Sequence, residues 1–149
     1  MARSTYVYVT YIRTTPEKLW SALTDAEFMK QYWFGMHCES QWVPGSSWKL
    51  ISEEGQVYDV GQVVEAEPPR RLVLRWQNQW KPELTAEGES QCTMELEPVG
   101  PAVKLSITHT IEREGSKFIE AVSGGWPKIL SNLKSLLETG SAVWPGSPQ

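Results

Sequence analysis

Cysteine and histidine are scarce in this sequence, and neither occurs in a metal-binding pattern. The 149 residues include only Cys38 and Cys92, and only His37 and His109. The two cysteines lie far apart, as do the two histidines, with no CxxC or HExxH spacing, so the sequence predicts no metal site. Two cysteines are too few for a disulfide scaffold. We therefore expect both thiols to be reduced and the protein to be cytoplasmic.

Long apolar runs and basic runs are also missing. No segment reaches the roughly 18 apolar residues that a membrane-spanning helix needs. Residues 1–15 have no apolar core of the signal-peptide type. The net charge is −4, with acidic and basic residues interspersed, which is unlike a nucleic-acid-binding surface. We expect no nucleic-acid or membrane partner, and the oligomeric state stays open between monomer and homodimer.

The motifs of common catalytic and nucleotide-binding sites are missing as well. The sequence contains no GxGxxG, no Walker loop and no GxSxG nucleophile elbow. The glutamate pairs at 65 and 67 and at 95 and 97 have the spacing of a solvated strand face. We therefore predict no cofactor and no catalytic residue, and the sequence favours a protein that is not an enzyme.

Alternating apolar residues predict short strands over most of the chain. Strands are expected at residues 6–13, 38–43, 47–52, 56–67, 71–77, 90–97 and 102–112. They are expected to pair as antiparallel hairpins, because no crossover helix lies between them. Thr15-Pro16 and Asp25 are typical starts of two short helices after the first strand. Residues 78–89 are polar and predict a loop, and Gly61 is expected at a bulge or bend.

The last periodic segment, residues 115–140, predicts one long amphipathic helix. Its apolar residues recur at steps of three and four, so they form a stripe that needs a surface to cover. The polar face is expected to hold Ser131, Asn132, Lys134, Ser135 and Glu138. Gly124-Gly125 and Pro127 favour a kink or restart near Trp126. The pattern predicts an α+β domain at residues 1–140, with a curved sheet around this helix, and a disordered tail at 141–149.

Several segments together resemble the activator of heat-shock-protein-90 ATPase homologue-like family, within the START and birch-pollen-allergen (SRPBCC) superfamily. They are the opening strand with TTPEKLWSALTD, the turn Trp33-Phe34-Gly35, the run from Gly61 to Trp76, and the closing Gly124 to Glu138. The resemblance covers residues 5–139. It implies a helix-grip fold, in which a bent antiparallel sheet of about six or seven strands surrounds a long C-terminal helix. The Gly-Gly-Trp-Pro segment departs from the family's continuous helix.

The resemblance also implies a cavity between the sheet and the long helix. The candidate lining residues are those on inward strand faces and on the helix stripe, with two aromatic residues at the mouth. They are Trp48, Tyr58, Leu74, Trp76, Met94, His109, Trp126 and Leu130, with Trp33 and Phe34 guarding the mouth. The alternative is that these side chains fill a close-packed core. His109 is either a hydrogen-bonded core residue or a polar group that faces the cavity.

Three functions follow from the resemblance. The first is the binding of a small hydrophobic or amphipathic ligand, with His109 as the main polar contact. The second is a chaperone-associated or stress-response interaction, which an exposed apolar patch on the outer sheet would favour. The third is a polyketide cyclase- or aromatase-like enzyme using His109 and Tyr58, which a strongly shifted His109 would favour. Fold-level analogy alone does not decide among them.

Overall fold

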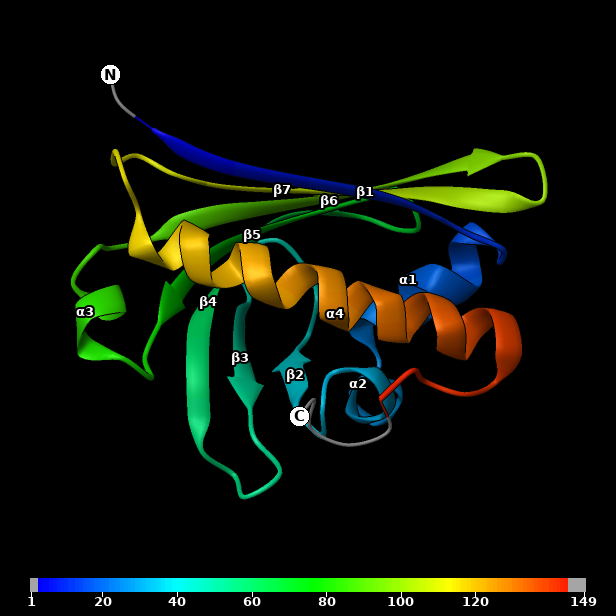
Figure 1. Ribbon diagram of the computed structural model, residues 1–149, viewed down its shortest axis with the longest axis horizontal. Helices are drawn as coiled ribbons and strands as arrows, with labels where there is room; N and C mark the ends of the chain where they lie inside the picture. The colour runs from blue at the N-terminus through cyan, green and yellow to red at the C-terminus, as the bar shows by residue number, and fades with distance from the viewer. Residues whose placement is uncertain (1–2, 145–149) are drawn as a thin grey trace.

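The computed structural model describes residues 3–144. Within this range the chain forms one seven-stranded antiparallel sheet and four helices (Figure 1). The strands are β1 (Ser4–Ile12), β2 (His37–Ser40), β3 (Ser47–Ile51), β4 (Val57–Glu67), β5 (Arg71–Asn78), β6 (Ser90–Val99) and β7 (Ala102–Ile111). The helices are α1 (Pro16–Thr24), α2 (Ala26–Tyr32), α3 (Pro82–Thr85) and α4 (Lys117–Thr139). The strand order is β1-β7-β6-β5-β4-β3-β2.

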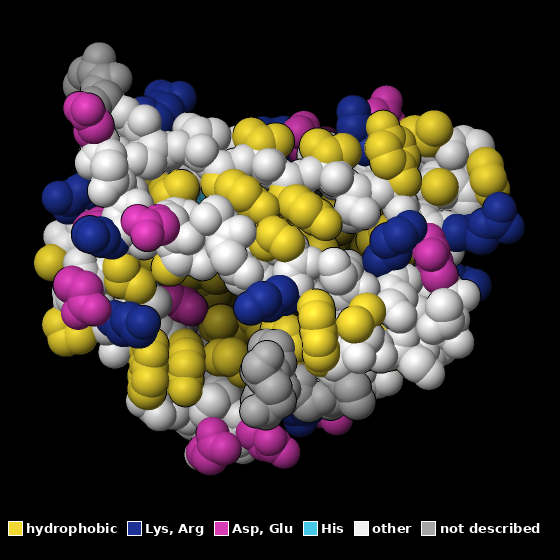
Figure 2. Space-filling model, viewed as in Figure 1, with side chains coloured by type: hydrophobic (Ala, Val, Ile, Leu, Met, Phe, Trp, Pro, Cys, Tyr) yellow, Lys and Arg dark blue, Asp and Glu magenta, His cyan; other side chains and the backbone are white. Residues whose placement is uncertain are grey.

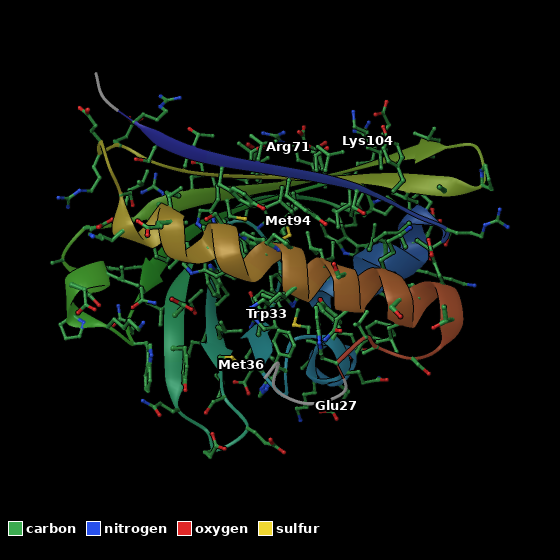
Figure 3. The ribbon with its side chains drawn as sticks, in the orientation of Figure 1. Glu27, Trp33, Met36, Arg71, Met94 and Lys104 are labelled. Atoms are coloured by element: carbon green, nitrogen blue, oxygen red, sulfur yellow. The ribbon has the colours of Figure 1, made fainter. Side chains whose placement is uncertain are left out.

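The sheet curves around α4, which lies along its inner face (Figure 1). Residues alternate between the two faces, so that Leu105 and Ile107 of β7 are fully buried, whereas Val7 and Tyr11 of β1 are exposed on the outer face. Figure 3 shows Met94 between the sheet and α4, and Arg71 and Lys104 on the outer face. This arrangement confirms the predicted α+β helix-grip fold.

The two short helices begin where the sequence predicted. The Thr15 hydroxyl accepts a hydrogen bond from the amide of Lys18 at 3.2 Å, and Pro16 occupies the first turn of α1. The Asp25 carboxylate accepts one from the amide of Glu27 at 2.9 Å and so caps α2. Helix α2 packs against α4, and α1 packs against α2 and β6, so the two short helices close one end of the core.

Helix α4 runs without interruption from Lys117 to Thr139, through Pro127 (Figure 1). The predicted restart near Trp126 is therefore wrong. The Pro127 ring removes one backbone donor but does not end the helix, because the apolar stripe is held against the sheet on both sides of it. The ends follow expectation: Ser116 caps the start, and Gly140 adopts a φ of 88° at the end. None of the helices between residues 3 and 144 is long and apolar enough to span a membrane.

Asn132 lies in the core, which corrects its predicted place on the polar face of α4. It is fully buried and donates to the carbonyl of Tyr32 at 3.2 Å. It also exchanges hydrogen bonds with the backbone amide and carbonyl of Trp144, at 2.8 and 3.0 Å. Residues 141–144, predicted to begin a disordered tail, are thus attached to α4. The rest of that tail, residues 145–149, lies outside the described residues.

Strand β4 contains the irregularity that the sequence placed at Gly61, but three residues further along. The register with β5 shifts between Val63 and Glu65, which marks a bulge at Val64. Gly61 instead lies where the buried Trp48 indole crosses β4 to donate to the carbonyl of Arg75 at 2.9 Å. A Cβ at Gly61 would stand 1.8 Å from that carbonyl oxygen. Glycine is therefore required here by close approach, not by a turn.

The two cysteines are free and buried, as the sequence predicted. Burial raises the pKa of the Cys38 thiol, with the nearby Asp59 carboxylate adding to the effect. Burial likewise raises the pKa of the Cys92 thiol. Both thiols are therefore protonated and inert near neutral pH.

Candidate ligand-binding site

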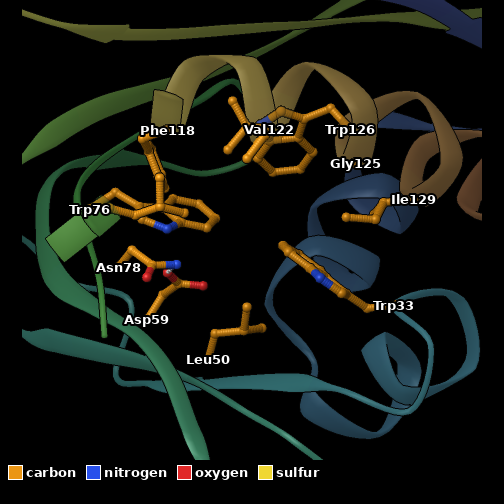
Figure 4. A pocket seen from close by; sticks show the side chains of 12 residues that line it. Trp33, Leu50, Asp59, Trp76, Asn78, Phe118, Val122, Gly125, Trp126 and Ile129 are labelled. Carbon is orange, nitrogen blue, oxygen red and sulfur yellow. Dashed lines mark hydrogen bonds between the residues drawn. The ribbon is translucent and has the colours of Figure 1, made fainter. Parts of the chain in front are cut away.

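A cavity of about 180 Å³ lies between the first half of α4 and strands β3, β4 and β5 (Figure 4). Figure 2 shows a hollow at the surface below α4, with largely hydrophobic walls. The walls are formed by Trp33, Leu50, Trp76, Leu84, Phe118, Ala121, Val122, Gly125, Trp126 and Ile129. A volume near 150 Å³ holds a benzene ring, so this cavity fits a single-ring molecule or one end of a larger one.

One carboxylate, that of Asp59, faces this apolar cavity from β4 (Figure 4). Asp59 is 7% exposed, and its Oδ1 accepts a hydrogen bond from Asn78 Nδ2 at 3.0 Å. Burial raises its pKa to about 6, although Trp76 and Asn78 act to lower it. No lysine, arginine or histidine between residues 3 and 144 forms an ion pair with it. The cavity thus contains a buried, unpaired carboxylate that is ionised above about pH 6.

The indole of Trp76 brings a second polar atom to the same place. Its N–H is buried and has no partner at hydrogen-bonding geometry. The ring lies beside Asp59 and Asn78 in Figure 4, close enough for its dipole to favour the ionised carboxylate. An unpaired buried N–H is uncommon in folded proteins and indicates a place where a ligand or water completes the bonding.

Asn78 holds the loop that closes this end of the cavity. Its Oδ1 accepts from the amides of Trp80 and Lys81, at 3.0 and 2.9 Å, while its Nδ2 donates to Asp59. The loop, predicted to be without secondary structure, contains the short helix α3, from which Leu84 reaches the cavity. Asn78 therefore couples the position of α3 to the buried carboxylate.

Glu87, just after α3, connects this loop to the start of α4. Its carboxylate accepts from Ser116 Oγ at 2.6 Å and from the amides of Lys117 and Phe118 at 2.9 and 3.3 Å. Burial opposes ionisation, but these three hydrogen bonds outweigh it, so the pKa of Glu87 is lowered. The contact also suits the positive end of the helix dipole.

Replacing Glu87 by glutamine should lower the free energy of unfolding by about 1 kcal/mol at pH 7, a small value because the carboxylate is partly solvated. A carboxylate with a lowered pKa contributes stability that is present above its unfolded value of 4.5 and is lost as pH falls through the folded value. The difference should therefore shrink below pH 4 in urea denaturation. Glu83→Gln, on the exposed side of α3, is the control and should change little. An equal loss of unfolding free energy at pH 7 and below pH 4 would contradict the ionic role of Glu87.

Three tryptophans pack around the cavity. The rings of Trp33 and Trp126 are 5.6 Å apart, and those of Trp76 and Trp126 are 5.8 Å apart, both edge to face. They come from the segment after α2, from β5 and from α4, so the cavity depends on the complete fold. Trp48 lies behind Trp76 at 4.7 Å and supports it from the core.

His109 is a core residue and does not line the cavity, which corrects its predicted role as the main polar contact. It is fully buried, and burial lowers its pKa to about 3. Its Nδ1 accepts from the Trp126 indole N–H at 3.2 Å, so the proton lies on Nε2, which donates to Ser90 Oγ at 2.9 Å. Ser90 Oγ in turn donates to the carbonyl of Trp76 at 3.2 Å. The lowered pKa therefore reflects burial of a hydrogen-bonded core residue, and His109 is not an acid or base facing a substrate.

The other predicted site residues divide into cavity, core and surface positions. Trp33, Trp76 and Trp126 line the cavity together. Trp48, Leu74, Met94 and Leu130 are buried core residues outside it. Tyr58 faces away and stacks on Trp80, with ring centroids 4.4 Å apart. Phe34 is half-buried against Trp144, at 6.5 Å. The other lining residues were not among the predicted ones: Leu50, Asp59, Asn78, Leu84, Phe118, Ala121, Val122, Gly125 and Ile129.

The model of the family described as "Activator of Hsp90 ATPase homolog 1-like protein" matches residues 13–138 of the chain. The chain belongs to this family. The match extends from the end of β1 to the last turn of α4 and thus includes every element around the cavity. None of the curated proteins compared with the chain matches it.

Solved structures similar to this family member share its fold. The Aha1 dimer from Colwellia psychrerythraea has a TM-score of 0.74 at 22% identity, covering 92% of this chain and 98% of that one. An HSP90 activator from Plasmodium falciparum has a TM-score of 0.72 at 24% identity, covering 89% and 95%. CalU16 from Micromonospora echinospora has a TM-score of 0.73 at 19% identity, covering 91% and 77%. At these identities the likeness shows the fold alone.

Proposed function

We propose that this protein binds a small amphipathic molecule in the cavity beneath α4. The observation that supports this most is a buried, unpaired carboxylate facing an apolar space of about 180 Å³. A structural core would fill that space with side chains and would not retain an unpaired charge. The ligand has an apolar body of about one ring, and a polar group that reaches Asp59.

Gly125 supports the same proposal, because it keeps part of the cavity wall free of a side chain. It lines the cavity, and a Cβ added there would meet no atom within 4 Å. The neighbouring Gly124 is exposed and lies outside the cavity. The two glycines are therefore suited to a matched test, in which one added side chain occupies the binding space and the other points elsewhere.

We expect Gly125→Leu to weaken ligand binding at least tenfold, whereas Gly124→Leu should bind like the native protein. The test is a thermal-shift screen of single-ring amphipaths that includes benzyl alcohol and benzylamine. A ligand at a hundredfold excess over its Kd should stabilise the native protein by about 2.7 kcal/mol. The proposal fails if no such compound binds the native protein, or if both leucine variants bind equally well.

A second candidate function is a protein–protein interaction of the kind named for the HSP90 activator relatives. It rests on the outer face of β1, where Val7 and Tyr11 are 57% and 51% exposed on an edge strand. Val7→Thr with Tyr11→Thr should reduce stimulation of an HSP90 ATPase without changing ligand binding.

The Aha1 relative is a dimer, and the sedimentation of this protein would distinguish monomer from homodimer. A cytoplasmic location is part of either proposal, and its two free thiols are consistent with it.

A further inference from the structure

The geometry points to an organic ammonium ion as the ligand, its charged group against Asp59 and its body among the tryptophan rings. This inference rests on the proposed small-molecule function and narrows it to one chemical class. It starts from the unmatched charge: Asp59 is 93% buried, its hydrogen bond comes from Asn78 with the Trp76 indole N–H close by, and it has no cationic partner among residues 3–144. A buried carboxylate is normally paired, because desolvation of a lone charge is costly.

The missing partner has to come from outside the chain. Asp59 is the only titratable residue among those that line the cavity in the described chain, and the Cys38 thiol, whose pKa the Asp59 charge helps to raise, is protonated. Asn78 uses its oxygen on the loop amides, so that only its N–H faces the carboxylate. Asp59 Oδ2, which accepts no hydrogen bond within the described chain, is therefore available for a strong donor. A cationic donor gives the shortest and strongest hydrogen bond to a carboxylate.

The aromatic walls favour the same chemistry. Trp33, Trp76, Trp126 and Phe118 surround the space above Asp59 from three different elements of the fold (Figure 4). The edge-to-face packing of the indoles leaves their ring systems at large angles to one another, 61° and 73°. Cations are attracted to the faces of such rings, and tryptophan gives the largest effect. A carboxylate below and aromatic rings around it would hold an ammonium group and its hydrocarbon substituent together.

The size of the cavity limits the class further. About 180 Å³ accommodates a single ring with a short aminoalkyl group. Anionic ligands such as fatty acids are disfavoured, since their headgroup would meet the Asp59 carboxylate. Neutral alcohols of the same shape can hydrogen-bond to Asp59 without matching its charge.

The test compares benzylammonium with benzyl alcohol and benzoate by isothermal titration at pH 7.5. We expect benzylammonium to bind at least tenfold more tightly than benzyl alcohol, and benzoate not to bind. Asp59→Asn should reduce this preference to less than threefold while leaving benzyl alcohol within twofold. The benzylammonium affinity of the native protein should also fall between pH 7.5 and pH 5, as Asp59 becomes protonated.

The controls separate this inference from the broader proposal. Trp33→Leu should weaken benzylammonium binding, whereas Trp80→Leu, which changes a ring stacked on Tyr58 outside the cavity, should not. If benzyl alcohol binds as tightly as benzylammonium, and Gly125→Leu abolishes both, the ammonium inference is wrong and the ligand-binding function stands. If none of the three compounds binds, and the wider single-ring screen also finds no ligand, the ammonium inference and the ligand-binding proposal are both wrong.

Discussion

A Gly61→Ala variant should be destabilised by about 3 kcal/mol or more, enough to prevent folding if the native protein is only marginally stable. The added Cβ would lie 1.8 Å from the Arg75 carbonyl oxygen and 2.6 Å from Trp48 Nε1. Those two atoms are hydrogen-bonded to each other in the middle of the sheet, at 2.9 Å. Neither can retreat unless β4 separates from β5 or the Trp48 indole leaves the core.

The measurement is the urea midpoint of Gly61→Ala beside that of Gly124→Ala. Gly124 is exposed in α4, and a Cβ there meets no atom within 4 Å. Alanine should stabilise that helical position by about 0.5–1 kcal/mol. The two substitutions add the same methyl group and should move the midpoint in opposite directions. An unchanged midpoint for Gly61→Ala would show that the crossing of Trp48 over β4 is not as described.

An Asp59→Asn variant should be more stable than the native protein at pH 8, by about 2–3 kcal/mol. Burial raises the pKa of Asp59 from 3.8 to about 6, and a change of that size corresponds to about 3 kcal/mol. Because the pKa of Asp59 is higher in the folded state, the contribution of its carboxyl group to the free energy of unfolding is fully present below pH 3.8. This contribution is lost as pH rises through about 6. Asparagine avoids that loss and still offers an oxygen to Asn78.

The experiment follows unfolding by urea between pH 4 and pH 8 for both proteins. The advantage of asparagine should be greatest at pH 8 and absent near pH 4. Glu54→Gln, which changes an exposed carboxylate in the β3–β4 turn, should show no such trend. A residue that lowers the free energy of unfolding, as Asp59 is expected to do at pH 8, is typical of a binding site, where function outweighs stability. If Asp59→Asn is destabilising at every pH, the carboxylate has a structural role and the ligand proposals lose their main support.

The architecture was predictable because it depends on strong periodic signals. The apolar alternation in β6 and β7 and the apolar stripe along α4 each repeat over ten or more residues. The apolar face of the sheet and the apolar stripe of the helix are buried by packing against each other. The caps at Thr15, Asp25 and Gly140 were also predictable, since local chemistry alone sets them. The continuity of α4 through Pro127 was not, because tertiary packing decides whether one missing donor ends a helix.

The site was harder to predict because the alternation of side chains along β4 decides which residue, Tyr58 or Asp59, faces the cavity. Ala66 lies opposite the inward-facing Leu72, and counting back by twos along a regular strand brings Tyr58 inward. The bulge at Val64 adds one residue, so Asp59 faces the cavity and Tyr58 turns outward. The adjacent valines Val63 and Val64 break the alternation and were the available signal. His109 illustrates the opposite case, because its position was predicted correctly but its partners were not visible in the sequence.

The central claim, that a small molecule occupies the cavity beneath α4, is tested most directly by the indole N–H signals of the eight tryptophans. We would titrate ¹⁵N-labelled protein with benzylammonium, with signals assigned from single Trp→Phe variants. The account predicts saturable shifts with one common Kd for Trp33, Trp76 and Trp126, largest for the unpaired Trp76 N–H, and no shift for Trp80. Shifts confined to Trp80 and the other tryptophans outside the cavity, or the same shifts in Gly125→Leu, would contradict it.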